Sequence, residues 1–248
     1  MVGNMRWRKE QAGDWQGSDS LTHAPRYDTI ASILRKFGAD MSVLDVGCGE
    51  ATLRARLPKN TRYVGIERSG AAARIALKRT DSIDIIHTTA ESFDSRGERF
   101  DSIVFNEMLY YADDPIGLLK KYSFLLREGG VILCSIYQKP GTNSLTSRLL
   151  HYLDRRRPIS NVHCEKMVRA FMTNEAWPIL EDQAVAIPGH VSLWWHIWLT
   201  QPPNKIIDKN LRGRPDSAIR RTGDMEYPAR NEAPSSPGST LMISRVTS

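Results

Sequence analysis

The sequence predicts an α/β fold built on a doubly wound, mostly parallel sheet. From about Tyr27 to Tyr137, short apolar runs rich in Val, Ile and Leu alternate with segments whose apolar residues recur at helical spacing. This alternation is typical of a parallel sheet with helices on both faces. A turn containing Gly47 and Gly49 follows the first run, and Glu67 closes the second. Because such sheets bind ligands outside the carboxyl ends of their strands, these residues predict a ligand site there.

The predicted elements follow one another in a regular order. The first five strands are expected near residues 42–46, 62–66, 82–87, 101–105 and 130–137. Helices are expected near residues 26–37, 50–57, 70–79 and 114–126. Ser69 is the candidate N-cap of the third helix, and Asp113 or Asp114 caps the fourth, with Pro115 in its first turn. The segment Arg127–Gly130 then ends that helix and leads into the fifth strand.

After the fifth strand the regular alternation ends. Residues 145–153 carry an apolar face at helical spacing, and residues 164–176 are predicted to form another helix. Two further strands are expected at residues 179–187 and 191–200, separated by a Pro-Gly turn signal. These strands complete the expected sheet as its last pair.

The stretch from Val43 to Glu50 joins a buried strand to an Asp-x-Gly-x-Gly turn. Gly47 and Gly49 lack the β-carbons that would keep a ligand away from the main chain. The helix expected after the turn would present unpaired N-terminal amides to an anionic group. Dinucleotide-binding turns are also rich in glycine, but Thr52 replaces their third glycine here and would crowd the packing of helix on strand. The turn therefore favours a different nucleotide-like cofactor.

From about Tyr27 to about Pro202 the chain resembles the class I S-adenosylmethionine-dependent methyltransferases. The segments that carry the resemblance stand in the family's order: VLDVGCGEATL (43–53), YVGIE (63–67), HTTAESF (87–93), and FDSIVFNEMLYYADDP (100–115) followed by LLREGGVILCSIY (125–137). The resemblance implies a Rossmann-like, seven-stranded, mostly parallel sheet with an antiparallel last strand pair and a helical cap.

The resemblance implies S-adenosylmethionine as the cofactor. Asp45 and the turn from Gly47 to Gly49 would hold the methionine end, and Glu67 would bind the ribose hydroxyls. Cys48 is interpreted as a small packing residue of the turn. Because dehydrogenases also place an acid at the end of the second strand, Glu67 does not separate the two cofactor classes.

The adenine is expected beside Ala90 and Glu91. The family usually has an acidic residue just before the Ala, to accept from the adenine amino group, whereas this chain has Thr89. The predicted cofactor-binding residues are Asp45, Gly47, Cys48, Gly49, Glu67, Arg68, Thr89, Ala90, Glu91 and Asn106.

In methyl transfer the acceptor atom attacks the methyl group in line with its bond to the sulfonium. Because the donor is already activated, correct positioning of acceptor and donor supplies much of the acceleration. Asn106 and Glu107 follow the fourth strand, beside the expected sulfonium, and Tyr110 and Tyr111 follow on the same loop. Related small-molecule enzymes often have His where this chain has Tyr111. Glu107 or the tyrosine hydroxyls would orient an amine acceptor.

A hydroxyl acceptor would need a base, and a His of the cap is the better candidate. His151 and His163 lie in the expected cap, while His190 and His196 lie near the last strands. For each of these residues a structural role competes with catalysis. The predicted catalytic residues are Glu107, Tyr111 and His151.

The residues after the fourth strand also bear on the acceptor. Enzymes that methylate adenine or amides have Asn/Asp-Pro-Pro-Tyr/Phe there, whereas this chain has Asn106–Leu109. The run NEMLYY is weakly similar to nodulation-type N-methyltransferases and to other enzymes acting on sugars or glycolipid precursors. We expect transfer to an oxygen or nitrogen of a small molecule such as a saccharide or natural-product intermediate. No metal site is expected, because Asp113 and Asp114 are explained as a helix cap.

Composition agrees with the expectation of a soluble, cytoplasmic enzyme. The 248 residues are 41% hydrophobic and 25% charged, enough for one domain plus tails. Three cysteines without C-x-x-C spacing argue against a disulfide framework or a zinc site and favour a reducing compartment. The N-terminus is too polar for a signal peptide, and the apolar cluster at 192–199 is too short to span a bilayer. No membrane insertion is expected.

The formal net charge of +6 is mostly dispersed. Its densest run, Arg155–Arg157, is shorter than a typical nucleic-acid-binding arm, so nucleic acid is not the expected partner. An RNA or protein methyltransferase remains the alternative if this run and the basic tail share one face. A non-catalytic S-adenosylmethionine-binding regulatory protein is a second alternative, and a nicotinamide dehydrogenase a third. The oligomeric state is left open.

The expected domain organisation has three parts. Residues 1–25 form an N-terminal segment that contributes to the substrate cap. Residues 26–201 form the methyltransferase domain, with a cap insertion at 139–176. Residues 202–248 are rich in Pro, Arg, Asn, Ser and Asp and are expected to form a disordered tail.

Overall fold

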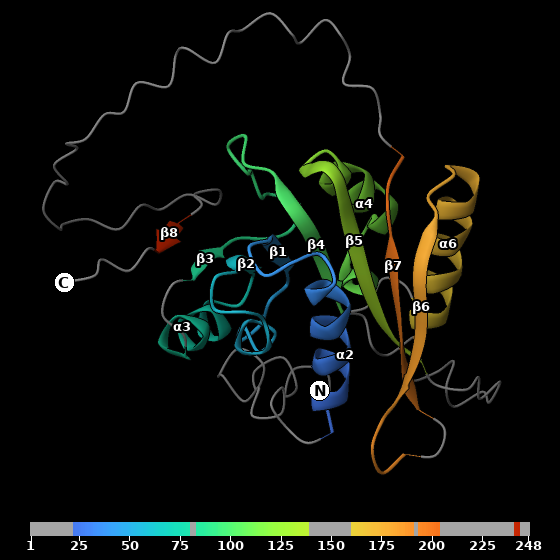
Figure 1. Cartoon of the computed structure of the whole chain (residues 1–248), viewed down its shortest axis with the longest axis horizontal. Helices are drawn as coiled ribbons and strands as arrows, with labels where there is room; N and C mark the ends of the chain where they lie inside the picture. Colours follow the sequence, from blue (N-terminus) through green and yellow to red (C-terminus); the bar gives the residue numbers. More distant parts are fainter. Residues whose placement is uncertain (1–21, 80–82, 139–159, 191–192, 204–240, 244–248) are drawn as a thin grey trace, which may run out of the picture.

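The computed structural model describes residues 22–79, 83–138, 160–190, 193–203 and 241–243. They form one twisted sheet with helices on both faces (Figure 1). Its strands are β1 (Ser42–Val46), β2 (Arg62–Glu67), β3 (Asp84–His87), β4 (Phe100–Asn106), β5 (Leu126–Gln138), β6 (Ile179–Ala186), β7 (Trp194–Thr200) and β8 (Leu241–Ile243). The helices are α2 (Ala24–Arg35), α3 (Gly70–Arg79), α4 (Pro115–Ser123) and α6 (Asn161–Asn174), with 3-10 turns η1 (Arg54–Arg56) and η2 (Leu109–Tyr111).

The strand order is β6-β7-β5-β4-β1-β2-β3-β8. Strands β1 to β5 pair in parallel, and β7 runs antiparallel to both of its neighbours, β5 and β6. The predicted seven-stranded, mostly parallel sheet with an antiparallel last pair is confirmed. The order reverses direction between β1 and β4, and such switch points are where open α/β sheets bind ligands.

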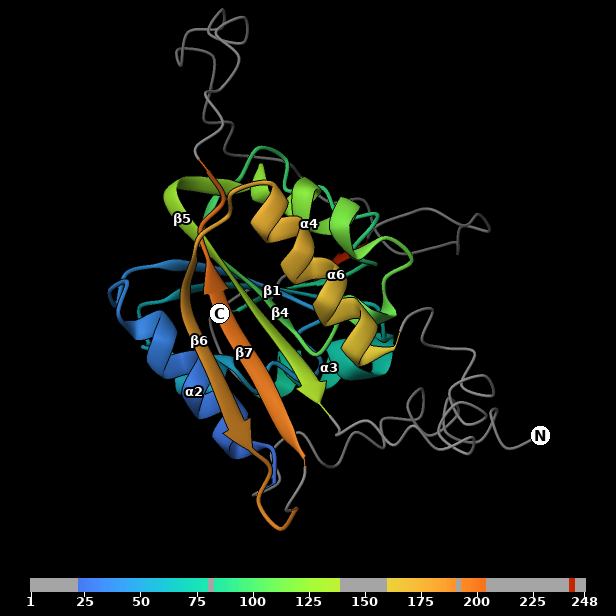
Figure 2. The same ribbon diagram turned by 90° about the vertical axis from the view of Figure 1, so that its right-hand side faces the viewer.

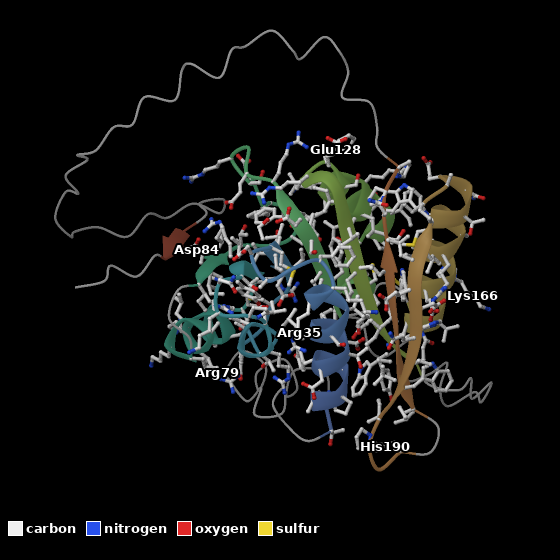
Figure 3. All side chains as sticks on the ribbon, in the orientation of Figure 1. Arg35, Arg79, Asp84, Glu128, Lys166 and His190 are labelled. Atoms are coloured by element: carbon white, nitrogen blue, oxygen red, sulfur yellow. The ribbon has the colours of Figure 1, made fainter. Side chains whose placement is uncertain are left out.

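Two helical layers cover the sheet (Figure 2). Apolar side chains of α4 and α6 are buried with one face, and those of α2 and α3, with Leu53 and Leu57 on either side of η1, are buried with the other. Side chains of the two edges lie far apart: Glu128 lies at the amino edge of the parallel strands, and His190 lies beyond their carboxyl edge (Figure 3). The predicted ligand site therefore faces the edge that carries His190.

The prediction of a helix at residues 50–57 is wrong. This segment consists of turns and the short η1 (Arg54–Arg56). Gly49 and Ala51 both have φ of +57°, which a right-handed helix cannot contain. No α-helix N-terminus therefore follows the glycine turn, and the anion-binding role expected of it does not apply.

The α4 boundary also differs from the prediction. Asp114 is the N-cap, since its side chain accepts from the Gly117 N–H at 2.8 Å. The helix ends at Ser123 rather than at 126, because Leu126 already pairs with Phe100 of β4. A register irregularity then carries β5 through its Gly-Gly segment.

The structure describes parts of the predicted cap insertion and of the predicted tail. α6 lies within the predicted cap insertion, yet its Cys164, Val168 and Met172 are buried in the core beneath it, so it belongs to the sheet layer. Residues 241–243 of the predicted disordered tail form β8, an antiparallel partner of β3. The predicted helix at 145–153, the rest of the cap insertion up to residue 159 and most of the N-terminal segment lie outside the described residues.

Candidate cofactor and acceptor site

The sheet register brings most of the predicted site residues to one edge. Asp45 pairs with Gly65 of β2 on one side and with Val104 of β4 on the other. The glycine turn after β1 therefore lies between the ends of β2 and β4, at Glu67 and Asn106. This is the switch point at which the strand order reverses.

The glycine turn folds back over the end of β2. The N–H groups of Gly47 and Cys48 both donate to the Ile66 carbonyl, at 2.8 and 3.0 Å. Gly47 and Gly49 have φ of +74° and +57°, a region that side chains disfavour. A Cβ at Gly47 would also lie 3.2 Å from the Met108 Cβ, so the loop after β4 packs directly on the turn.

Glu67 ties the turn to the start of α3. Its Oε2 accepts from the Gly49 N–H at 2.9 Å and its Oε1 from the Ser69 N–H at 2.6 Å. Burial raises the pKa of Glu67, although these two hydrogen bonds oppose the rise. The Arg68 N–H also lowers the pKa of this carboxylate. A carboxylate offers about four acceptor positions, so about one remains for a hydroxyl of a ligand.

Asp45 carries a buried carboxylate whose Oδ1 has no hydrogen-bond partner among the described residues. The residue is only 2% exposed, and its Oδ2 accepts from the Tyr63 hydroxyl at 2.6 Å. Burial raises the pKa of Asp45 to about 7, even with the Tyr63 hydrogen bond. Unsatisfied buried acceptors are rare in folded proteins, and one at a ligand edge indicates a missing donor.

Asn106 provides a second acceptor of this kind. Its Oδ1 is buried and has no partner in the part of the chain that the structure describes. Asn106 is the last residue of β4 and follows Phe105, which pairs with Val46 at the end of β1. Two buried oxygens from adjacent strands thus lack donors at one edge, which fits an ammonium group such as that of a methionine moiety.

Cys48 fills space within the turn. It is buried, and its Sγ lies 2.7 Å from the position that a Cβ at Gly65 would occupy. Burial raises its pKa well above the ordinary value, so the thiol stays protonated. The contact explains why β2 carries glycine at position 65, since a side chain there would meet Cys48.

The predicted adenine residues lie in the loop after β3. Thr89 caps a short turn there, since its Oγ accepts from the Ser92 N–H at 3.2 Å and its carbonyl from the Phe93 N–H at 3.1 Å. Ala90 is buried and Glu91 is exposed. Arg68 lies nearby, where its carbonyl contacts His87 Nε2 at 3.0 Å, and its side chain is exposed.

Glu107 is engaged within the protein. Its carboxylate accepts from the Tyr110 hydroxyl at 2.8 Å and from Ser135 Oγ at 3.3 Å. Its main chain has a φ of +60°, held by an N–H bond to the Ser135 carbonyl at 3.0 Å. Arg26 Nη1 lies 3.8 Å from Oε2. The carboxylate predicted to orient an acceptor therefore holds the loop after β4 in place.

The sequence interpretation did not identify Arg26. Its guanidinium is buried between the rings of Tyr27 and Trp195, at 4.8 and 5.0 Å from their centres. It brings a positive charge from α2 to the edge that carries Asp45 and Glu107. An arginine on the apolar face of an amphipathic helix was the available signal, because a buried charge needs partners.

The remaining catalytic candidates differ in their surroundings. Tyr111 is 40% exposed and its ring lies 4.6 Å from that of the buried Tyr110. It therefore presents an aromatic surface to solvent beside Glu107. His151 lies outside the described residues. His163 is on the exposed first turn of α6, where its N–H is capped by Ser160.

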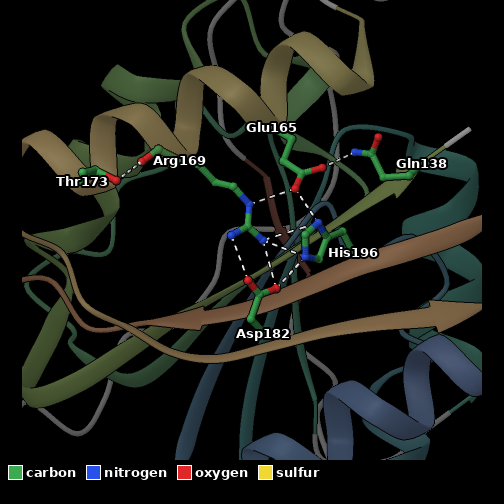
Figure 4. Close-up of polar contacts among 6 residues, drawn as sticks. All are labelled: Gln138, Glu165, Arg169, Thr173, Asp182 and His196. Atoms are coloured by element: carbon green, nitrogen blue, oxygen red, sulfur yellow. Dashed lines mark hydrogen bonds and ion pairs between the residues drawn. The ribbon is translucent and has the colours of Figure 1, made fainter. Parts of the chain in front are cut away.

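His196 belongs to an ion-pair cluster that joins α6 to the last strands (Figure 4). It lies between the carboxylates of Glu165 and Asp182, with its Nε2 2.5 Å from Asp182 Oδ1. Arg169 also bridges these two carboxylates, at 2.8 and 2.9 Å. The hydrogen bond to Glu165 is the main cause that raises the pKa of His196. These contacts give His196 a structural role.

Two features of the described residues bear on other functions. No group of three or more His, Cys, Asp or Glu side chains within them has the arrangement of a metal site. Within the same residues, no helix has the length and apolar character needed to cross a membrane.

Curated proteins with similar sequences carry methyltransferase names. The ubiquinone biosynthesis O-methyltransferase of Dinoroseobacter shibae is 32% identical over 130 residues, which cover 46% of this chain and 52% of that protein. The protein of the same name from Ruegeria pomeroyi is 32% identical over 117 residues, covering 45% and 47%. The chain thus spans about half the length of the curated relatives it matches.

Solved structures share the fold at lower identity. The N-methyltransferase NodS from Bradyrhizobium japonicum WM9, in complex with S-adenosyl-L-homocysteine, has a TM-score of 0.61 at 19% identity, covering 81% of this chain and 98% of that one. The plantazolicin methyltransferase BpumL, also in complex with SAH, has a TM-score of 0.59 at 18% identity, covering 78% and 89%.

The family model described as a methyltransferase domain matches residues 20–183. This range contains the glycine turn, the acidic end of β2, the loop after β3 and the loop after β4. The match, the sheet topology and the cofactor-edge geometry agree, and the chain belongs to the class I S-adenosylmethionine-dependent methyltransferases.

Proposed function

We propose that the protein transfers a methyl group from S-adenosylmethionine to an oxygen or nitrogen of a small molecule. The observation that carries the proposal is the pair of unsatisfied buried oxygens, Asp45 Oδ1 and Asn106 Oδ1, at the switch point of the sheet. They match the positive charge of the methionine ammonium, and they lie beside a glycine turn whose main chain a ligand can reach. The position of these two oxygens at the ligand-binding edge is what makes them evidence for a bound ammonium group.

Each part of the cofactor has a proposed partner. Asp45 and Asn106 accept from the ammonium, and Glu67 accepts from the ribose with the acceptor position that the main-chain N–H groups leave open. The adenine lies against the loop after β3. The bound cofactor supplies an activated methyl group on its sulfonium, and the residues of the chain hold it in line with the acceptor.

Glu107 is a positioning residue in this proposal, because its carboxylate already serves Tyr110 and Ser135. Proton removal from a hydroxyl acceptor would then fall to another group, and His151 stays the candidate for that role. The exposed ring of Tyr111 is suited to an apolar or aromatic acceptor face. The curated relatives are named as O-methyltransferases, which favours hydroxyl acceptors over amines.

The compartment and the cap remain part of the proposal. Cys48, Cys134 and Cys164 are all buried free thiols, which supports a reducing compartment such as the cytoplasm. The segments 1–25 and 139–159 are proposed to build the substrate cap, since they adjoin α2 and the end of β5 in sequence.

A transfer assay tests the function. The purified protein would be incubated with S-adenosylmethionine and separate sets of phenols, saccharides and small amines, and formation of S-adenosylhomocysteine would be followed. We expect turnover with a hydroxyl-bearing set. Cofactor binding without turnover on any set, including RNA and peptide controls, would contradict the proposed transfer and support a non-catalytic binding protein.

A further inference from the structure

A lysine of α4 holds the loop that is proposed to bind adenine. Lys121 Nζ donates to the carbonyl oxygens of Ala90, Glu91 and Phe93, at 3.3, 2.7 and 2.8 Å. An ammonium group has three protons, so these three carbonyls use its full donor capacity. Burial lowers the pKa of Lys121, because the ammonium is partly withdrawn from water where it meets the loop.

The next residue of α4 acts on the same loop. The Tyr122 hydroxyl donates to the Ala90 carbonyl at 3.0 Å. Its ring is fully buried, stacked on Phe93 with centres 6.1 Å apart and edge-on to Phe105 at 5.3 Å. The Ala90 carbonyl is therefore directed toward α4 by two donors.

The direction of that carbonyl fixes the direction of an N–H group. In a trans peptide the C=O and the following N–H point to opposite sides. No peptide bond among the described residues is cis, so the Glu91 N–H points away from α4 when the Ala90 carbonyl points toward it. Lys121 and Tyr122 thus set the orientation of a main-chain donor in the loop.

This donor gains importance because of Thr89. The family usually has an acid at this position to accept from the adenine amino group, whereas the Thr89 hydroxyl is used to cap the loop's own turn. Recognition of adenine then depends more on main-chain groups, and these are correctly placed only when the loop is well ordered.

We propose that Lys121 is a positioning residue of the adenine site, which orients the Glu91 N–H by holding the Ala90 and Glu91 carbonyls. This inference rests on the proposed function. Lys121 does not itself touch the cofactor. It acts by fixing the conformation of the loop that does.

The test compares two ligands on matched variants. Lys121→Met removes the donors and keeps a side chain of similar length, whereas Lys121→Arg keeps donors. Lys120→Met is the control, because Lys120 is the preceding residue of α4, and its side chain is 45% exposed and pairs with Glu175 at 3.6 Å. Calorimetry would measure Kd for S-adenosylhomocysteine and for S-ribosylhomocysteine, which lacks the adenine.

We expect Lys121→Met to raise the Kd for S-adenosylhomocysteine about tenfold, the effect of losing one hydrogen bond from the Glu91 N–H to the adenine, and to leave the Kd for S-ribosylhomocysteine within about twofold. Lys121→Arg should recover part of the loss, and Lys120→Met should match the wild type. An unchanged Kd in Lys121→Met, or an equal loss for both ligands, would overturn the inference.

Failure of the proposed function has a different signature. Wild-type protein that is folded but binds no S-adenosylhomocysteine would reject the cofactor assignment and the adenine role together. Amide hydrogen exchange of residues 89–93 in the ligand-free protein tests the clamp separately. Faster exchange in Lys121→Met than in Lys120→Met is expected, and equal exchange would show that Lys121 does not order the loop.

Discussion

Replacement of Glu67 by Gln tests the ribose site with little change in shape. Each carboxylate oxygen of Glu67 accepts one main-chain N–H, from Gly49 at 2.9 Å and from Ser69 at 2.6 Å. The amide of the Glu67→Gln variant would offer one oxygen and one NH₂ group, so one of these N–H groups would face a donor and one ribose hydroxyl would lose its acceptor. A lost hydrogen bond to a charged group costs about 1.5–3 kcal/mol, which corresponds to a Kd about ten to 150 times higher.

Calorimetric titration with S-adenosylhomocysteine would measure this change. Urea unfolding of the same samples would show that the variant is folded. Glu128→Gln is the matched control, because it removes the same charge from an exposed position at the opposite edge of the sheet (Figure 3). We expect the control to keep the wild-type Kd. A folded Glu67→Gln protein with a Kd within about twofold of the wild type would refute the placement of ribose at Glu67.

Three further predictions concern Asp45, Thr89 and His196. Burial raises the pKa of Asp45 to about 7, and an ammonium ligand prefers the ionised carboxylate. The affinity for S-adenosylhomocysteine should therefore fall below about pH 7, by up to about tenfold per pH unit. The affinity of Asp45→Asn should depend less on pH, and a dependence as steep as that of the wild type would contradict the contact. Thr89→Asp adds the acceptor that the family usually has and should strengthen binding by about 1 kcal/mol, about fivefold in Kd, whereas unchanged affinity would place the adenine amino group elsewhere. The pKa of His196 is raised above 6.5 by its hydrogen bond to Glu165, so its contribution to the free energy of unfolding is fully present below about pH 6.5 and lost as the pH rises through the raised value. Urea unfolding should show that the difference in free energy of unfolding between the wild type and His196→Gln becomes smaller over that pH range. A difference that does not depend on pH would argue against the ion pair.

The sheet was predictable because its strands are short apolar runs with clear ends. Asp114 was among the predicted caps because a side-chain acceptor before proline is a local signal. The helix at 50–57 was predicted wrongly, since its apolar spacing is helical but Ala51 adopts a positive φ that the residue type does not reveal. Local patterns therefore succeed where the conformation is common and fail where tertiary structure imposes a rare one.

The residues of the candidate site also fall into those that a local pattern predicts and those that only the fold reveals. Asp45, Gly47, Gly49 and Glu67 stand in motifs, so a sequence can point to them. Contacts between distant segments leave no such pattern.

Arg26 reaches Glu107 from another segment of the chain, and Lys121 reaches the Ala90 carbonyl. The engagement of Glu107 by Tyr110 and Ser135 also emerged only from the fold, and it changes the residue's proposed role from orienting an acceptor to holding a loop.

The central claim is that the carboxyl edge of the sheet binds S-adenosylmethionine. Calorimetric titration of the wild-type protein with S-adenosylmethionine, S-adenosylhomocysteine and NAD in parallel tests it most directly. We expect micromolar binding of both adenosyl ligands and none of NAD. Folded protein that binds neither adenosyl ligand would contradict this claim and leave the glycine turn with a structural role alone.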